Sequence, residues 1–396
     1  MKKLFWKRIM AIVLAIIAVQ SFTLPLLAQE VETLSEREAS QTAVSLNLAC
    51  KSAVLMEATT GTVLYEQNAN EALPPASVTK IMTLLLIMEA LDAGTVRLDS
   101  TVSVSSNAAS MGGSQVYLKE GEQMKLEDLL KSVVIASAND AAVALAEHLC
   151  GSVAVFVEKM NAKAKALGME NTHFENVTGL DDTAENHLTS ALDIAKMSRE
   201  LISHKSILQY SSIWMDSIRD GAFGLTNTNR LVRYYSGCTG LKTGSTEKAG
   251  FCISATAERD GMSLICVIMG AESRDMRNES ACILLDWGFS EYAVYKLDAA
   301  ECDAIRVMGG ESAYCKTEHP SFSAVVKKTE LSAVTERVVV PDQITAPVRS
   351  GDTVGTLEIR HKDALLGSVP ILASQSVGRI NFFQILYRMT AKFLLI

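Results

Sequence analysis

The pattern of hydrophobic and polar positions predicts strands at both ends of region 49–291, with helices between them. Two short β-type runs, 53–57 and 62–65, flank a glycine turn and predict a hairpin. Apolar strand patterns return in one run through 240–256, turn at 258–261 and come back over 262–269. Helices are expected over residues 81–88, 126–135, 140–151, 153–167, 188–202 and 274–287. This order predicts an α+β fold with one antiparallel sheet covered by helices.

Two of these helix starts carry local signals. Ile81 to Met88 is apolar on every face and follows Pro74-Pro75-Ala76, so a loop should turn there into a buried helix. The pattern breaks at 136–139, and Asp140 is expected to be the N-cap of the next helix.

Beyond Tyr292 the pattern changes to short β-type runs separated by Pro, Gly and Ser. Examples are 322–326, 336–340 and 353–357. We therefore expect a catalytic domain over 49–291 and a second, small all-β domain over 292–377.

The N-terminus reads as an export signal over residues 1–28, followed by a linker over 29–48. Lys2, Lys3, Lys7 and Arg8 precede an apolar core, and Leu26-Leu27-Ala28 is a candidate cleavage site. An uncleaved membrane anchor is the alternative, and both place the bulk of the chain outside the cytoplasm.

Composition narrows the class of partner. The chain has 396 residues, 48% of them hydrophobic, and a formal net charge of −8. This is a globular composition, and its acidic balance argues against nucleic acid as a partner. The eight cysteines are scattered without framework or metal-ligand spacing, so we expect mostly free, buried thiols, with one or two disulfides left open. No metal site or cofactor is indicated.

The candidate chemistry starts at Ser77-Val78-Thr79-Lys80. Ser77 should lie at the first turn of the buried helix, and Lys80, three residues on, shares its face. A serine hydroxyl becomes a nucleophile when a neighbouring base takes its proton, and a lysine can be that base if burial or a second cation lowers its pKa. The tetrapeptide is a weak signal alone, because Ser245-Thr246-Glu247-Lys248 repeats it in a polar turn.

Two further motifs strengthen the tetrapeptide as evidence for a catalytic site. Ser137-Ala138-Asn139 falls at the break between two predicted helices, and Lys242-Thr243-Gly244 opens an apolar strand. Three weak motifs in this order, each in suitable local structure, make a strong signal for a serine enzyme of the penicillin-recognising type.

The chain resembles the penicillin-recognising serine enzymes, and within them the D-alanyl-D-alanine carboxypeptidases, the low-molecular-mass penicillin-binding proteins. The resemblance implies a β-lactamase/transpeptidase-like fold and an acyl-enzyme formed on Ser77. Lys80 would be its base, and Ser137 would relay a proton. Asn139 would orient Lys80 and hydrogen-bond the substrate amide. Lys242 and Thr243 would bind the terminal carboxylate of a peptidoglycan stem pentapeptide, and β-lactams would inhibit.

The same resemblance assigns two backbone roles. Gly244 would leave the strand edge bare for the substrate, and the N–H groups of Ser77 and Ser245 would form the oxyanion hole.

The alternative functions are a β-lactamase and a vestigial cell-wall binding module. Ala138 and Thr189 stand where β-lactamases usually have Asp and Asn, which favours the carboxypeptidase.

The segment 378–396 predicts an amphipathic helix that lies on the outer face of the cytoplasmic membrane. As a helix, residues 380–396 would span ~25 Å, which is short for a hydrocarbon core of ~30 Å. Asn381, Gln384, Arg388 and Lys392 share one face, and apolar side chains occupy the others. Arg388 and Lys392 are expected to meet anionic head groups. A helix packed on the β-rich domain is the alternative.

Overall fold

The computed structural model describes residues 46–181 and 184–393. The expected signal (1–28) and nearly all of the linker lie outside the described residues, as do residues 394–396 at the end of the expected anchor.

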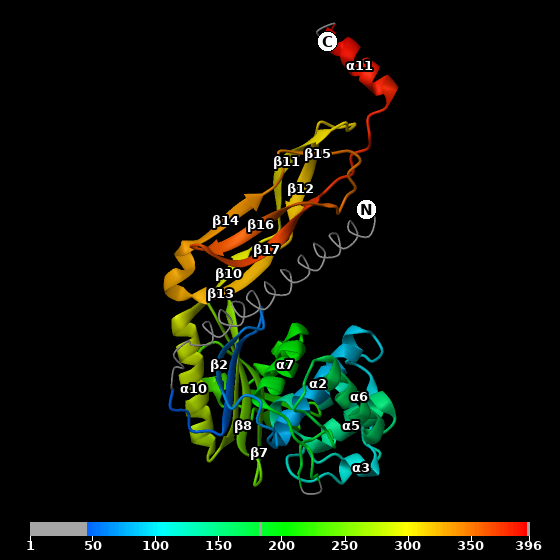
Figure 1. Ribbon diagram of the computed structural model, residues 1–396. Coiled ribbons are helices and arrows are strands. Elements are labelled where there is room, and N and C mark those ends of the chain that lie inside the picture. The colour runs from blue at the N-terminus through cyan, green and yellow to red at the C-terminus, as the bar shows by residue number, and fades with distance from the viewer. Residues whose placement is uncertain (1–45, 182–183, 394–396) are drawn as a thin grey trace, which may run out of the picture. The chain divides into compact units, whose positions relative to one another are not determined.

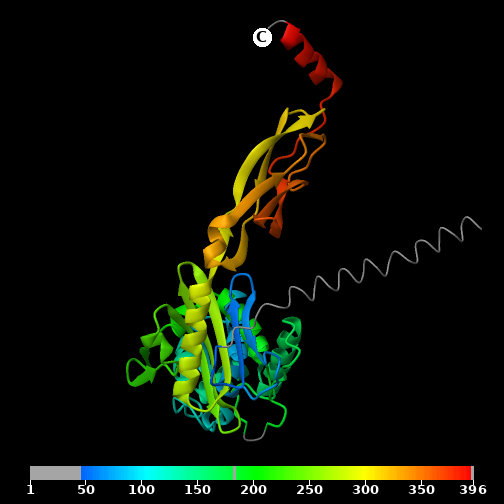
Figure 2. The same cartoon turned by 60° about the vertical axis from the view of Figure 1, so that its left-hand side comes forward.

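A five-stranded antiparallel sheet forms the centre of the first part of the chain (Figures 1 and 2). Its strand order is β2-β1-β9-β8-β7, so the N-terminal hairpin pairs with the last three strands. The strands are β1 (Ser52–Glu57), β2 (Val63–Gln67), β7 (Cys238–Thr246), β8 (Gly250–Arg259) and β9 (Met262–Ala271). Every residue of β1 is buried, because helices cover both faces of the sheet. The expected α+β fold is confirmed.

Helix α10 (Arg274–Glu291) covers one face of this sheet, and α7 (Ala191–Ser203) lies on the other (Figure 1). Helix α2 (Lys80–Asp92) packs against α7 and is buried along ten of its 13 residues, which fits its all-round apolar sequence. The remaining helices and strands here are β3 (Thr101–Ser103), α3 (Ser106–Ala109), β4 (Gln123–Lys125), α4 (Leu126–Ala136), α5 (Asn139–Cys150), α6 (Val153–Ala166), α8 (Ile207–Ser211), β5 (Met215–Ile218), β6 (Phe223–Thr226) and α9 (Leu231–Tyr234).

Three details differ from the sequence-based expectation. Ser77 lies in a 3-10 turn, η1 (Ala76–Thr79), which precedes α2. Asp140 is not the N-cap of α5; Ala138 is, and the Asp140 carboxylate accepts hydrogen bonds from the backbone N–H groups of Val116 and Leu118 instead. The strand pattern through 240–256 is two strands, β7 and β8, joined by a turn at 247–249.

The second part of the chain is β-rich from Tyr292 onward. It holds a pair, β10 (Tyr292–Leu297) and β13 (Phe322–Lys327), and a six-stranded sheet of order β14-β16-β17-β12-β11-β15. Two small apolar clusters stabilise it, one around Cys315 and one around Ile359. The other segments are β11 (Ala300–Met308), β12 (Tyr314–His319), η2 (Lys328–Ala333), β14 (Val334–Val339), β15 (Gln343–Thr345), β16 (Thr353–His361) and β17 (Ala364–Ala373).

The C-terminal helix α11 (Phe382–Phe393) exposes large apolar side chains. Phe382, Phe383 and Tyr387 are 70%, 79% and 74% exposed. The Arg388 guanidinium, expected to meet anionic head groups, donates here to the backbone carbonyls of Gly310 and Glu311.

Two further expectations bear on cysteines and on membrane spans. All eight cysteines are free thiols, three of them buried and five half-buried. Within the described residues, no single helix is long and apolar enough to cross a membrane; only α5 and α6 taken together, bent by 86°, meet that length and composition.

Candidate active site

The Ser77 hydroxyl and the Lys80 amine are in direct contact. Lys80 Nζ lies 2.8 Å from Ser77 Oγ and donates to the backbone carbonyl of Thr178 at 2.8 Å. Lys80 is fully buried, whereas Ser77 is half-buried and lines an open groove of about 610 Å³. The 3-10 turn followed by a helix thus aims a solvent-accessible hydroxyl at an amine that water does not reach.

Burial holds the pKa of Lys80 well below its usual value, and the cation of Lys242 lowers it further, while Asp140 opposes both effects. An unprotonated amine has a lone pair that can accept the serine proton. The physical requirement for a lysine base is therefore met at Lys80.

Ser137 and Lys242 form a second contact between candidate site residues. Lys242 Nζ donates to Ser137 Oγ at 2.8 Å and to the Thr243 carbonyl at 3.0 Å. Ser137 ends α4 in the left-handed conformation, with φ 62°, which is unusual for a residue with a side chain and occurs often at functional sites. Burial, and then Arg277, lower the pKa of Lys242 to about 7.

Asn139 is buried beside these groups, with one of its amide atoms unpaired. Its Nδ2 donates to the Gly112 carbonyl at 2.7 Å, and its backbone N–H donates to the Ser114 carbonyl at 2.7 Å. Its Oδ1 is buried without a hydrogen-bond partner. A buried acceptor without a donor is costly, so Oδ1 is available to a further hydrogen-bond donor.

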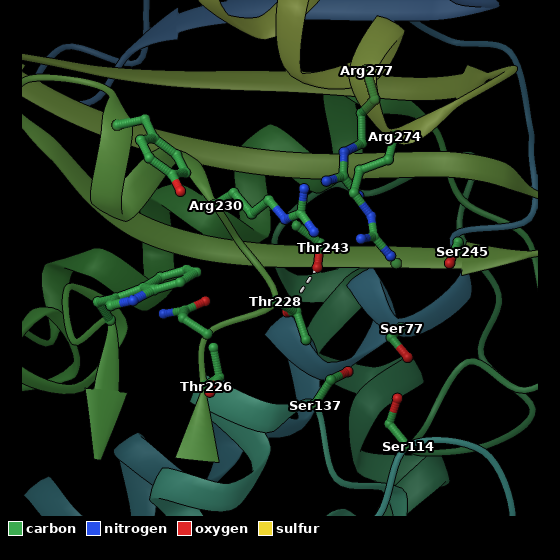
Figure 3. Close-up of a pocket in the computed structure, with 14 residues that line it drawn as sticks. Ser77, Ser114, Ser137, Thr226, Thr228, Arg230, Thr243, Ser245, Arg274 and Arg277 are labelled. Carbon is green, nitrogen blue, oxygen red and sulfur yellow. Dashed lines mark hydrogen bonds between the residues drawn. The ribbon is translucent and has the colours of Figure 1, made fainter. Parts of the chain in front are cut away.

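Strand β7 is the edge of the sheet and carries Thr243, Gly244 and Ser245 along the groove (Figure 3). A free strand edge can bind an extended peptide by backbone hydrogen bonds. Gly244 has a second reason to lack a side chain: an added Cβ would lie 2.7 Å from the backbone N of Ser77. The glycine therefore allows the strand to approach the backbone of Ser77.

Several groove residues were missed by the sequence analysis. Thr228 lies opposite Thr243, with their hydroxyls 2.8 Å apart. Arg230, Arg274 and Arg277 also line the groove, on the Thr243 side of that pair (Figure 3). They come from the segment before α9 and from the first turn of α10, and no motif or spacing in the sequence links them to Ser77.

A hydrogen-bonded chain braces the 3-10 turn that contains Ser77. The backbone N–H of Glu175 donates to His187 Nδ1 at 2.9 Å, so the ring proton is on Nε2 and can be donated to Thr79 Oγ1 at 2.7 Å. Thr79 in turn donates to the Ala76 carbonyl at 2.9 Å. Ala76 precedes Ser77 and has a φ of 48°, a strained value for alanine.

Burial lowers the pKa of His187 to about 4. The ring is therefore neutral near pH 7, as this chain of hydrogen bonds requires.

A serine with a buried lysine base under a free strand edge defines a serine acyl-enzyme hydrolase. Residues 37–273 match the family model described as D-alanyl-D-alanine carboxypeptidase, and residues 304–379 match that of the penicillin-binding protein 5 C-terminal domain. The chain belongs to the D-alanyl-D-alanine carboxypeptidase family of low-molecular-mass penicillin-binding proteins.

Relatives agree over most of the chain. D-alanyl-D-alanine carboxypeptidase DacF of Bacillus subtilis is 42% identical over 345 residues, 85% of this chain and 88% of the relative. Penicillin-binding protein 5 of Haemophilus influenzae superposes with a TM-score of 0.74 at 29% identity, over 84% of this chain and 98% of that one. Penicillin-binding protein D2 of Listeria monocytogenes, solved with ampicillin bound, gives a TM-score of 0.57 at 33% identity, over 62% and 99%.

These matches confirm the family, the fold and the serine-type carboxypeptidase activity expected from the sequence. The β-lactamase alternative is not favoured, because the relatives that match most of the chain are named as carboxypeptidases.

Proposed function

We propose that this carboxypeptidase removes the last D-alanine from peptidoglycan stem pentapeptides through an acyl-enzyme on Ser77. The observation that carries the proposal is the buried, pKa-lowered Lys80 amine 2.8 Å from Ser77 Oγ. Lys80 takes the hydroxyl proton as Ser77 attacks the carbonyl of the D-Ala-D-Ala bond. The backbone N–H groups of Ser77 and Ser245 stabilise the oxyanion.

The terminal carboxylate binds at Lys242 and Thr243, and the donor peptide extends along the edge of β7. Ser137, held by Lys242 at 2.8 Å, relays a proton to the leaving D-alanine nitrogen. Asn139 accepts a hydrogen bond from Lys80 or from the substrate amide through its unpaired Oδ1. Water then attacks the acyl ester, and the acyl peptide leaves from Ser77.

β-Lactams acylate the same serine, and the resulting acyl-enzyme hydrolyses slowly. The test is to incubate the purified protein with penicillin and with a pentapeptide. The proposal expects a long-lived penicilloyl adduct together with D-alanine release. Rapid turnover of penicillin would indicate a β-lactamase, and absence of both reactions would indicate a binding module with a vestigial site.

We further propose that the catalytic domain is 49–291, the β-rich domain 292–377 and the anchor 378–396. Because no assigned site residue lies beyond Ser245, a protein ending near Tyr292 should react with penicillin if it folds. A folded fragment that does not react would show that the β-rich domain contributes to the site.

The enzyme acts on the cell wall, outside the cytoplasm, and we propose that α11 holds it on the outer face of the cytoplasmic membrane. The exposed apolar side chains of Phe382, Phe383, Tyr387 and Met389 support this, since such a set would insert among lipid tails. Arg388 reaches lipid head groups only if it leaves its two carbonyl partners.

Two variants test the anchor on anionic vesicles. Removal of residues 379–396 should release active enzyme into solution. Glu at both Arg388 and Lys392 should weaken binding, whereas a deleted protein that still sediments with membranes would place the anchor elsewhere.

A further inference from the structure

Residues 112–118, which we call the strap, contain no helix or strand, yet they contribute Ser114 to the lining of the groove (Figure 3). Val116 and Leu118 are buried, whereas Tyr117 between them is exposed and has a φ of 57°. Two glycines begin the strap, so its sequence does little to restrict its backbone. Contacts with other parts of the chain must therefore hold it in place.

The buried carboxylate of Asp140 is one of these contacts. Asp140 is 1% exposed and lies in the first turn of α5, where the helix dipole favours a negative charge. It accepts hydrogen bonds from the backbone N–H groups of Val116 at 3.1 Å, Leu118 at 3.0 Å and Ala141 at 2.9 Å. Within residues 46–181 and 184–393 no basic side chain forms an ion pair with it. Because both strap residues are buried, their N–H groups depend on this carboxylate for a partner.

The strap in turn fixes the amide of Asn139. Asn139 Nδ2 donates to the Gly112 carbonyl at 2.7 Å, and the Asn139 backbone N–H donates to the Ser114 carbonyl at 2.7 Å. The strap passes so close that a Cβ added to Gly113 would lie 2.8 Å from Asn139 Nδ2. Since Nδ2 is used in this way, Oδ1 is the amide atom that remains unpaired.

The charge of Asp140 also acts on the lysine base. Burial holds the pKa of Lys80 well below its usual value, Lys242 on β7 lowers it further, and Asp140 on α5 opposes both effects. His187 contacts Thr79, the residue before Lys80, but the ring is neutral near pH 7, because burial lowers its pKa to about 4. Loss of the Asp140 carboxylate should therefore lower the pKa of Lys80 further.

A second tether reaches the strap from the turn between β5 and β6. The Arg219 guanidinium donates to the Val116 carbonyl at 2.9 Å and forms an ion pair with Glu122 at 2.8 Å. Because Glu122 balances the charge of Arg219, this tether holds the strap without placing a net charge beside it. Asp140 and Arg219 thus act on the same segment, but only Asp140 does so with a buried, unpaired charge.

We propose that Asp140 is a positioning residue for the acylation of Ser77. It holds the strap so that the Asn139 amide presents Oδ1 to Lys80 and to the substrate, and its charge sets the pH range in which Lys80 acts as the base. This inference rests on the proposed function, in which Lys80 is the base and Oδ1 accepts a hydrogen bond.

The test is Asp140→Asn in the full chain, with acylation by a chromogenic β-lactam followed across pH. The asparagine has nearly the same shape, but its NH₂ group would face backbone N–H donors, and the charge is lost. We expect the acylation rate to fall by about ten- to a hundredfold, as for a lost hydrogen bond to a charged group. The limb of the rate that rises with pH should move to lower pH, because nothing then opposes burial and Lys242.

Two further variants separate the strap from the charge. Arg219→Lys keeps the positive charge but loses the fork that reaches Val116 and Glu122 together, so it should slow acylation and leave the rising limb in place. Asp193 is a matched control: it is 1% exposed near the start of α7 and accepts the backbone N–H of Asn171 at 2.9 Å. Asp193→Asn should leave the rate and the limb unchanged, even if Tm falls.

The outcomes distinguish this inference from the proposed function. A wild-type protein that forms no adduct on Ser77 would overturn the proposed mechanism. If the wild type is acylated normally, a wild-type rate in Asp140→Asn would overturn the positioning role alone. A slower Asp140→Asn with an unmoved limb would do so as well, because the residue would then serve structure only. If Asp140→Asn does not fold, Arg219→Lys decides, and a wild-type acylation rate in that variant would overturn the proposal.

Discussion

The chain contains the same tetrapeptide pattern twice, at Ser77–Lys80 and at Ser245–Lys248, in very different surroundings. The first pair lies where a 3-10 turn enters a buried helix, and Lys80 is fully buried against Ser77. The second pair spans the end of β7 and the turn after it, and both side chains are exposed. Lys248 donates to the Asp181 carbonyl at 2.8 Å and does not hydrogen-bond Ser245.

The difference shows that the chemistry resides in the environment of the motif. A lysine becomes a base when its charged form is destabilised by burial and by a second cation, and Lys80 has both. Lys248 has neither, because its side chain is in solvent. In both copies the serine and the lysine have the same spacing, so the spacing cannot tell them apart. In the sequence, only the apolar run after Lys80, which predicts a buried helix, distinguishes the first copy.

Replacing the two serines should break the comparison most sharply. Ser77→Ala should lower D-alanine release on the order of 10⁴-fold or more and abolish penicillin labelling, because it removes the atom that is acylated. Ser245→Ala should retain most of both, since a backbone N–H and no hydroxyl is assigned there. Labelling that survives in the first variant and vanishes in the second would reverse the assignment.

Replacing the two lysines, Lys80 and Lys248, should have the next largest effect, on the acylation rate. Lys80→Arg should reduce the acylation rate by about 10³-fold, because a guanidinium stays protonated and cannot accept the serine proton. Lys248→Arg keeps its exposed charge and should act like the wild type. Stopped-flow acylation by a chromogenic β-lactam measures both, and a normal rate in Lys80→Arg would exclude Lys80 as the base.

The chain of hydrogen bonds from His187 through Thr79 to Ala76 should contribute about tenfold to kcat. His187→Ala removes the hydrogen bond to Thr79 and loosens the strained Ala76 turn, and small misplacements of a nucleophile are costly. We expect kcat to fall with KM nearly unchanged, and His187→Gln, which can still donate to Thr79, to recover most of it. If Tm falls while kcat stays the same, the chain of hydrogen bonds serves folding only.

The smallest effect is a shift in pH dependence. Activity should rise with pH as Lys80 loses its proton, and fall above a pH near 7 in the free enzyme as Lys242 becomes neutral. Because Arg277 lowers the pKa of Lys242, Arg277→Gln should move the falling limb of kcat/KM to higher pH. Lys248→Ala should leave both limbs in place, and an unmoved limb in Arg277→Gln would exclude Lys242 as its source.

The sequence allowed prediction of those parts of the site that are local. Ser77, Lys80, Ser137 and Asn139 lie at helix boundaries that the hydrophobic pattern marks. Lys242 was expected at the start of a strand, but it is the fifth residue of β7, which already begins at Cys238. The sheet could be predicted too, because its strands lie at the two ends of one region with helices between them.

Non-local packing was out of reach. Nothing in the sequence places Arg230, Arg274 or Thr228 at the groove, since the folding of α9 and α10 onto the sheet brings them there. Asp140 looked like a helix cap, yet its carboxylate is used by the backbone of a distant loop. The turn that splits β7 from β8 was hidden because β-type residues lie on both sides of it.

The central claim is that burial makes one of the two Ser-x-x-Lys copies catalytic, and mapping the penicilloyl group tests it most directly. The protein is incubated with penicillin, digested and sequenced by tandem mass spectrometry. We expect one adduct, on the peptide that contains Ser77, and an unmodified peptide that contains Ser245. An adduct on Ser245, or a protein that stays unmodified under conditions that saturate a related carboxypeptidase, would contradict the account.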